Sequence, residues 1–336
     1  MKVVVLEDWN HFFAGPSLER LRQRAEVEVQ HDHPADQADV VARLRGAEVV
    51  VLNRERTPFG AAAIDQLPAL ELIVQTGGVS PNVDLAAATA RGVAVGTGPG
   101  LPNSIEGVAE LALGLLLSLA RRIPANDRNV RTGRWEVAPT VMLSGATMGI
   151  VGLGRLGRHL ARLGHGLNMR VLAAGPTLTP ERAAQSEAEL VALDDLFPRA
   201  DAVFVCTRLS ETTRGLVTRR HLASMKPSSF LINVARGPIV DEEALLEALQ
   251  AGRIAGAGLD VYGREPLAVD HPLTRLDNVV LTPHIGWVTA DNVLRFVDSV
   301  VETIERYLDG DYSRIVNPDA LGRRRSSAGS PPSTRS

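Results

Sequence analysis

Three residues in separate parts of this 336-residue chain have the side chains that reduction of a 2-keto acid requires. Arg236 lies in the segment NVARG, Glu265 in YGREP and His284 in TPHIG. A guanidinium can bind a carboxylate through two parallel hydrogen bonds, and an imidazole can transfer a proton near neutral pH. A neighbouring carboxylate favours the charged imidazolium and orients its ring. We therefore expect Arg236 to hold the substrate carboxylate, His284 to be the acid/base and Glu265 to be its partner.

Each of these residues also has an ordinary structural interpretation. Arg236 could be a surface arginine, Glu265 a loop acid before a proline and His284 a turn histidine. Their placement favours the catalytic interpretation, because each follows closely on a predicted strand at the edge where open α/β sheets bind ligands. Asp241 and Glu242 begin the next helix and are interpreted as a cap and a partner of the helix dipole.

A glycine fingerprint upstream predicts a dinucleotide site. The segment GLGRLG at 152–157 directly follows a predicted strand and opens a helix that runs to about Gly164, which is the context in which this motif binds a dinucleotide. Gly152 allows the tight turn, Gly154 lets the backbone approach the pyrophosphate, and Gly157 lets the helix pack closely on the strand. The helix N-terminus then offers free N–H groups to the phosphates.

The residue that usually separates NAD from NADP is missing from this sequence. An acidic residue about 20 positions beyond the glycines normally accepts the ribose hydroxyls of NAD. Gly175 stands at that position, and no Asp or Glu occurs between Arg155 and Pro180. The nearest arginine that could bind a 2′-phosphate is Arg182, and Thr177 is the only nearby hydroxyl. The cofactor is therefore NAD or NADP, and we expect weak discrimination between the two.

The elements that must position these residues alternate between short β-branched runs and helical stretches, which is typical of parallel sheets built from βα units. The sequence predicts two doubly wound α/β domains, Rossmann-like or flavodoxin-like, with a cleft between them. The first has expected strands at 2–6, 25–30, 48–53, 70–75 and 93–96, and the second at 147–151, 170–174, 202–206, 230–234, 257–261 and 279–282.

The expected domain boundaries follow from a glycine- and proline-rich loop at 96–102 and from the helices on either side of the second sheet. Residues 1–99 and 288–317 form a discontinuous substrate domain, because a final helix at 291–308 is expected to pack back on the first sheet. Residues 100–287, opened by a long helix at 104–122, form the NAD(P)-binding domain. The remaining residues, 318–336, are expected to be a disordered tail.

Composition excludes several classes of protein. The net charge of −3 and the scattered arginines give no reason to expect nucleic acid. The most apolar run, 111–120, is too short to span a bilayer, and the first eight residues lack the apolar region of a signal peptide. The single cysteine, Cys206, cannot form an internal disulfide, so a cytoplasmic location is expected. No metal site is expected.

Taken together, these motifs closely resemble the D-isomer-specific 2-hydroxyacid dehydrogenases, from about Leu52 to Asn317. The resemblance implies an NAD(P)-dependent enzyme, expected to be a homodimer, that interconverts a small 2-keto acid and the D-2-hydroxy acid. Two departures are Gly175 and the segment 206–208, which replaces a more usual proline-containing turn. The roles implied are catalysis for Arg236, Glu265 and His284; cofactor contact for Gly152, Gly154, Arg155, Leu156, Gly157, Thr207, Val234 and Asp260; and substrate contact for Gly77, Gly78, Val79 and Arg236.

Other interpretations stay open at this stage. Corepressors that resemble these dehydrogenases share the fold and the three catalytic residues, so a dinucleotide-sensing interaction protein is the rival hypothesis. Formate oxidation is less favoured, because a long N-terminal extension is expected for it. Arg54 resembles the position at which phosphoglycerate-type members bind a substrate phosphate, and it could equally be an exposed loop arginine. Trp287 could close the pocket over a small or apolar substrate.

Overall fold

The structure, a computed structural model, describes residues 1–54, 56–78, 82–99 and 104–327. It divides into two compact units, one formed by Met1–Pro102 with Thr289–Ser336 and the other by Asn103–Val288. The sequence placed the divisions at 99/100 and 287/288; the contacts place them at 102/103 and 288/289. Within the described ranges, no helix is long and apolar enough to cross a membrane.

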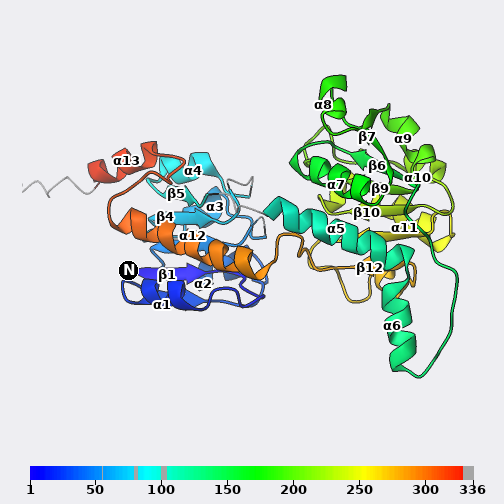
Figure 1. The fold of residues 1–336 in the computed structure, drawn as a ribbon. Helices are drawn as coiled ribbons and strands as arrows, with labels where there is room; N and C mark the ends of the chain where they lie inside the picture. The colour runs from blue at the N-terminus through cyan, green and yellow to red at the C-terminus, as the bar shows by residue number, and fades with distance from the viewer. Residues whose placement is uncertain (55, 79–81, 100–103, 328–336) are drawn as a thin grey trace, which may run out of the picture. The chain divides into compact units, whose positions relative to one another are not determined.

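The first unit is a five-stranded parallel sheet in the order β2-β1-β3-β4-β5. Helices α2, α3 and α4 pack on one face in a cluster with Val4, Val50 and Ile73, and α1 and α12 lie together on the other (Figure 1). The elements are β1 (Lys2–Val5), α1 (Pro16–Arg22), β2 (Glu26–Val29), α2 (Gln37–Arg43), β3 (Val49–Leu52), α3 (Ala61–Ile64), β4 (Leu72–Gln75), α4 (Leu85–Ala90), β5 (Ala94–Thr97) and α12 (Ala290–Leu308).

The central strands are continuous apolar runs because both faces of the sheet are covered. Strand β3 reads VVVL and is buried throughout, and β4 reads LIVQ and is also buried. Thr289 caps α12 through its hydroxyl, which accepts the N–H of Asn292. The helix that returns to the first sheet therefore begins one residue before its predicted start.

The C-terminal segment differs from the prediction. Residues from 318 onward were expected to be disordered, yet Asp319–Ser327 form helix α13, which contacts α4. The side chain of Asn317 accepts the N–H of Val95 at 2.7 Å and donates to the carbonyl of Val93 at 3.0 Å, and Ala320 is completely buried. These contacts attach the segment to the sheet before its Ser- and Arg-rich part begins. The last expected disordered residues, 328–336, lie outside the described ranges.

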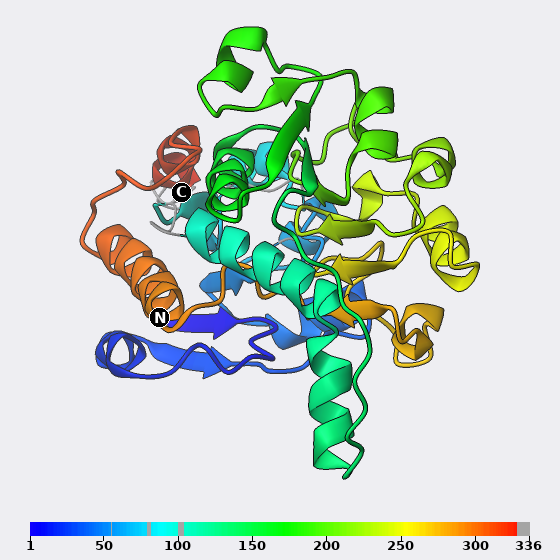
Figure 2. The same cartoon turned by 45° about the vertical axis from the view of Figure 1, so that its right-hand side comes forward.

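The second unit is a seven-stranded parallel sheet in the order β12-β11-β10-β9-β6-β7-β8. Figure 2 gives a second view of its green and yellow strands. Helices α5 and α7 share a core on one face, and α9, α10 and α11 share a core on the other. The elements are α5 (Ser104–Ala120), α6 (Ile123–Arg131), β6 (Thr147–Val151), α7 (Arg155–Gly166), β7 (Arg170–Ala174), α8 (Pro180–Ala184), β8 (Glu189–Leu190), α9 (Leu193–Arg199), β9 (Ala202–Val205), α10 (Arg219–Ser224), β10 (Phe230–Asn233), α11 (Glu242–Gln250), β11 (Gly256–Leu259) and β12 (Val279–Leu281), with short 3-10 turns at Gly237–Ile239 and Pro272–Arg275.

The expected α/β class with doubly wound parallel sheets is confirmed. Apart from shifts of one or two residues at the ends of four strands, two details of the second unit differ. Strand β8 was not predicted, because its two residues are exposed and too short to form a pattern. The helix expected at 104–122 ends at Ala120, because Arg122 adopts a left-handed φ of 52° and a separate helix, α6, starts at Ile123. From β6 the chain adds β7 and β8 on one side of the sheet and then β9 to β12 on the other. Open α/β sheets bind ligands beyond the carboxyl ends of the two strands at such a switch, here β6 and β9.

Candidate active site

The three predicted catalytic residues follow three neighbouring strands of the second sheet. Arg236 follows β10, Glu265 follows β11 and His284 follows β12. These strands pair in parallel, so their carboxyl ends lie at the same edge. The sheet therefore brings together residues that are up to 48 positions apart in the chain (284 − 236).

His284 and Glu265 are hydrogen-bonded to each other. His284 Nδ1 lies 2.7 Å from Glu265 Oε2, and the other carboxylate oxygen accepts the N–H of Tyr262 at 3.1 Å. Burial raises the pKa of Glu265, but the hydrogen bond and charge of His284, the Tyr262 N–H and the charge of Arg236 together hold it below its usual range. Glu265 is therefore an anion at neutral pH and can only accept, which assigns the donating proton to Nδ1. Nε2 takes no part in this hydrogen bond.

Asp260 holds the loop that carries His284. One carboxylate oxygen of this buried residue accepts the Thr282 hydroxyl at 2.7 Å and the Ile285 N–H at 2.8 Å, and the other accepts the Gly286 N–H at 2.9 Å. These contacts bracket His284, whose φ of 57° is uncommon for a non-glycine residue. Burial raises the pKa of Asp260, and the three hydrogen bonds oppose that shift. Asp260 was predicted to contact the cofactor, and this role was not predicted, because the residues of one strand do not indicate what the end of that strand will contact.

Arg236 is positioned by a side chain and by a close backbone contact. Asn233 accepts the N–H of Ala235 and donates to the carbonyl of Arg236, both at 3.1 Å. The guanidinium donates to the carbonyl of Ala235 at 2.7 Å. A Cβ at Gly237 would lie 2.0 Å from the carbonyl of Tyr262, so only glycine fits there. That contact joins the Arg236 loop to the loop that ends at Glu265.

The glycine loop has the geometry that a bound dinucleotide needs. Gly152 has a φ of 100° and a Cβ there would lie 2.8 Å from the N atom of Thr207, while a Cβ at Gly157 would lie 2.3 Å from the carbonyl oxygen of Gly152. At Gly154, by contrast, no atom lies within 4 Å of a built Cβ, and no side chain caps α7. The turn is tight where helix and strand meet and open at the helix N-terminus, so these residues fit a pyrophosphate.

The other predicted cofactor contacts lie around this loop. Arg155 is exposed at the first position of α7, and Leu156 beside it is half-buried. Thr207 follows β9 and packs against the turn, and Val234 is buried directly after β10. All four residues lie beyond the carboxyl ends of strands in the second unit or at the start of the helix that follows.

The end of β7 lies beside the glycine loop and carries no carboxylate. The N–H of Gly152 donates to the carbonyl of Ala174 at 2.8 Å, and a Cβ at Gly175 would lie 3.6 Å from the Cα of Gly152. The side chain of Arg182 folds back, and its Nη1 donates to the carbonyl of Thr177 at 2.8 Å. The sequence identifies Arg182 as the nearest arginine but not as a neighbour of Gly175, and the structure shows that its side chain returns to Thr177 at the strand end.

The predicted substrate residues of the first unit follow β4. Gly77 and Gly78 have φ values of 81° and 103°, which favour glycine. A Cβ at Gly77 would lie 2.8 Å from Nη1 of Arg54, so the guanidinium lies against this loop. Val79 lies outside the described residues. In the second unit, Trp287 is half-buried directly after Gly286.

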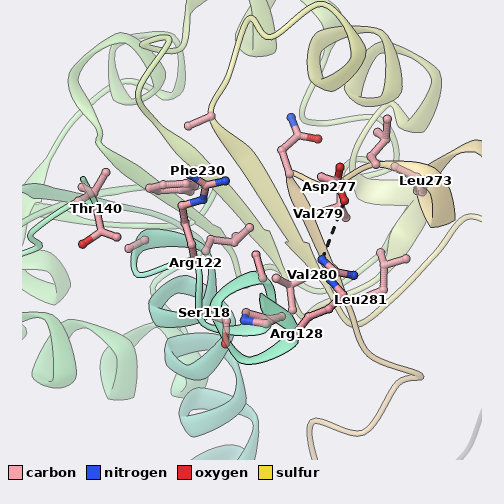
Figure 3. Close-up of a pocket in the computed structure, with 18 of the residues that line it drawn as sticks. Ser118, Arg122, Arg128, Thr140, Phe230, Leu273, Asp277, Val279, Val280 and Leu281 are labelled. Atoms are coloured by element: carbon pink, nitrogen blue, oxygen red, sulfur yellow. Dashed lines mark ion pairs between the residues drawn. The ribbon is translucent and has the colours of Figure 1, made fainter. Parts of the chain in front are cut away.

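The second unit also has a pocket of about 600 Å³ that contains none of the predicted site residues. Figure 3 shows it between α5, α6 and β12, with Arg128 directed toward Asp277 at 4.0 Å. It is also lined by Phe230, the first residue of β10, and by Asn278, which precedes β12. It therefore lies at the amino edge of the sheet, opposite the edge at which Arg236, Glu265 and His284 follow their strands.

The fold, the glycine loop and the histidine–glutamate pair together define a protein of the dinucleotide-binding α/β class. Comparison with known proteins identifies the family. Residues 113–286 match the family described as D-isomer specific 2-hydroxyacid dehydrogenase, NAD binding domain. The chain belongs to the D-isomer specific 2-hydroxyacid dehydrogenase family, as the motifs predicted.

Individual relatives agree with this assignment. The chain is 36% identical over 312 residues to a D-3-phosphoglycerate dehydrogenase of Archaeoglobus fulgidus, covering 92% of this chain and 58% of the relative. It is 34% identical over 312 residues to a glyoxylate reductase of Korarchaeum cryptofilum, and the match covers 90% of this chain and 93% of the reductase. The crystal structure of a phosphoglycerate oxidoreductase from Vibrio cholerae aligns with a TM-score of 0.85 at 32% identity. The alignment covers 92% of this chain and 99% of that chain. The chain thus spans little more than half of the phosphoglycerate dehydrogenase and nearly all of the other two.

Proposed function

We propose that this protein uses NAD or NADP to interconvert a small 2-keto acid and the corresponding D-2-hydroxy acid. The observation that carries the proposal is the 2.7 Å hydrogen bond between His284 Nδ1 and Glu265, on a loop held by Asp260. It leaves Nε2 as the proton-transfer atom. Family membership and the glycine loop support the cofactor class.

In the direction of reduction, His284 gives the proton on Nε2 to the substrate carbonyl oxygen. A bound nicotinamide dinucleotide supplies the hydride that the carbonyl carbon receives. Glu265 stabilises the imidazolium before the transfer and keeps Nδ1 as a donor throughout. Arg236 binds the substrate carboxylate and stabilises the charge that grows on the carbonyl oxygen. In oxidation, the neutral ring of His284 accepts the hydroxyl proton.

The substrate proposal is limited to small 2-keto acids. We infer that Gly77 and Gly78 offer backbone N–H groups to the substrate carboxylate. We also infer that Trp287 bounds the space for the substrate side chain. Arg54 lies against Gly77. We infer that its guanidinium binds a phosphate or a second carboxylate when the substrate carries one. One relative is named for phosphoglycerate and another for glyoxylate, so both a phosphorylated and an unphosphorylated acid belong in the assay.

We also propose that the protein uses both NADH and NADPH. Gly175 leaves the end of β7 without the carboxylate that would repel a 2′-phosphate, and Arg182 places a guanidinium at the same strand end. Neither feature requires the phosphate, because the Nη1 group of Arg182 already donates to the carbonyl of Thr177.

A homodimer and a cytoplasmic location complete the proposal. The stretch from α6 to β6 exposes apolar side chains, including Trp135 at 85% and Val137 at 92%, and exposed apolar patches commonly mark interfaces between proteins. Sedimentation analysis of the full chain and of Trp135→Ser should give a dimer that the substitution weakens. A wild-type monomer would contradict a homodimer. The lone Cys206 supports a reducing compartment.

Steady-state reduction of a keto-acid panel tests the proposed activity. The panel should include glyoxylate, pyruvate, hydroxypyruvate and 3-phosphohydroxypyruvate, each with NADH and with NADPH. We expect turnover with at least one acid and D-configured product. Tight cofactor binding without turnover on any acid would favour the rival interpretation as a dinucleotide-sensing interaction protein.

A further inference from the structure

Glu7 is a buried carboxylate for which the proposed mechanism has no use. It follows β1 by two residues, is completely buried, and has a left-handed φ of 57°. A buried carboxylate persists only when it is paired and hydrogen-bonded, and a strained backbone persists only when its surroundings hold it. Both features indicate that the contacts of Glu7 are specific.

Those contacts lead to the loop after β3. The hydroxyl of Thr57 donates to one carboxylate oxygen of Glu7, and Nδ1 of His33 contacts the other. The backbone carbonyl of Glu7 accepts Nη1 of Arg56 at 3.0 Å. One residue earlier, the carbonyl of Leu6 accepts the side chain of Asn53 at 2.7 Å. Residues 6 and 7 therefore hold residues 53, 56 and 57 at three separate points.

The same loop carries Arg54 to the predicted substrate glycines. The N–H of Arg54 donates to the hydroxyl of Thr76 at 2.8 Å, and its guanidinium lies against Gly77. The side chain of Asn82 closes the arrangement by donating to the carbonyl of Thr57 at 2.7 Å. Asn82 also donates to the carbonyl of Arg54 at 3.4 Å, so a chain of contacts runs from Glu7 through Thr57 and Asn82 to Arg54 and Gly77, entirely within the first unit.

A metal site does not explain this cluster. His11, His31 and His33 are near Asp8 and Glu7, but no set of three such side chains within the described ranges could hold a metal ion. Both carboxylate oxygens of Asp8 already accept backbone N–H groups, at 2.8 and 3.0 Å. The network around Glu7 consists of hydrogen bonds that fix backbone segments.

We propose that Glu7 is a positioning residue for substrate binding, which acts through Thr57 to hold Arg54 against the Gly77 loop. This inference rests on the proposed function. Because the loop contacts the same part of the substrate before and during reaction, loosening it should weaken substrate binding without slowing chemistry.

The test compares Thr57→Val with Thr57→Ser and with a matched control, Thr89→Val. Thr89 is also in the first unit, and its replacement by valine also removes hydroxyl hydrogen bonds, those with Leu85 and Asn317. Thr89 lies in α4 and not in the loop that carries Arg54. For Thr57→Val we expect the KM for the best keto acid to rise by about tenfold, the size of effect typical for a lost bond to a charged group. The kcat should stay within about twofold and the Kd for NADH should be unchanged. Thr57→Ser should restore the wild-type KM, and Thr89→Val should leave it unaltered.

Several results would overturn the inference. These are a Thr57→Val enzyme with wild-type KM, an equal rise in KM for Thr89→Val, or no rescue by serine. If Thr57→Val does not fold, Glu7→Gln preserves the side-chain size and should still raise KM; an unchanged KM would count equally against the inference. Absence of turnover in the wild type would contradict the proposed function, and with it this inference. An active wild type whose KM does not respond to Thr57→Val would contradict this inference alone.

Discussion

At the scale of single residues, the hydrogen bonds already formed around His284 determine which of its ring nitrogens faces no partner residue in the Glu265 pair. Glu265 accepts from His284 with one oxygen and from Tyr262 with the other, and Asp260 accepts three hydrogen bonds from the residues around His284. These partners leave Nε2 of His284 as the atom available for proton transfer. Two predictions follow from the charges of Glu265 and Arg236.

Replacing Glu265 with glutamine should move the pH profile of keto-acid reduction to lower pH. The pKa of Glu265 lies below its usual range, so the wild-type residue is an anion throughout the neutral range and stabilises the imidazolium. Reduction needs that imidazolium and declines as it loses its proton with rising pH. Without the anion, the decline should begin at lower pH. Rates measured from pH 5 to 9 check this, and a profile that coincides with the wild type would show that Glu265 does not tune His284.

Replacing Arg236 with lysine should damage substrate binding and turnover together. An ammonium is a point charge and cannot reproduce the two parallel hydrogen bonds of a guanidinium to a planar carboxylate. We expect KM to rise at least about tenfold, with a lower kcat. Saturation kinetics on the best keto acid measure both constants. If neither changed, Arg236 would not be the group that binds the carboxylate.

At the scale of elements, parallel strands explain most of what could be predicted. Strands β6 and β7 have the predicted bounds, and the ends of β10, β11 and β12 bring the three catalytic candidates to one edge. Periodicity and glycine placement identify such units because they depend on residues close in the chain. Contacts between distant segments could not be predicted. The clamp by Asp260 and the anchoring of α13 through Asn317 depend on such contacts. The return of Arg182 to Thr177 is local, but it depends on a side-chain conformation that the sequence does not specify.

The end of β7 gives a prediction about cofactor choice. Gly175→Asp should shift the enzyme toward NADH, because the new carboxylate can accept the ribose hydroxyls and repels a 2′-phosphate. A Cβ fits at this position, since it makes only ordinary contacts of 3.6 Å or more. The kcat/KM values for NADH and NADPH, measured for both proteins, give the result. A wild-type enzyme that already selects one cofactor by more than about 1000-fold, roughly 4 kcal/mol, would contradict the weak discrimination proposed above.

At the scale of the whole molecule, two α/β units carry different parts of the proposed chemistry. The second unit holds the glycine loop, Arg236, Glu265 and His284, and the first holds Gly77 and the loop anchored by Glu7. The sequence predicts both parallel sheets and the family. It could not predict how the loops at the sheet edges are held, because single residues such as Glu7 and Asp260 do this through partners at least 22 positions away (282 − 260).

The most direct test of the account is the rate of keto-acid reduction by the wild type and by His284→Asn, measured with the same acid and cofactor. General acid catalysis contributes about 10²–10⁴-fold, so kcat should fall at least about 100-fold in the variant. The Kd for NADH should be retained, because the glycine loop is untouched. A His284→Asn enzyme that reduces the acid at near the wild-type rate would contradict the central claim that His284 supplies the proton.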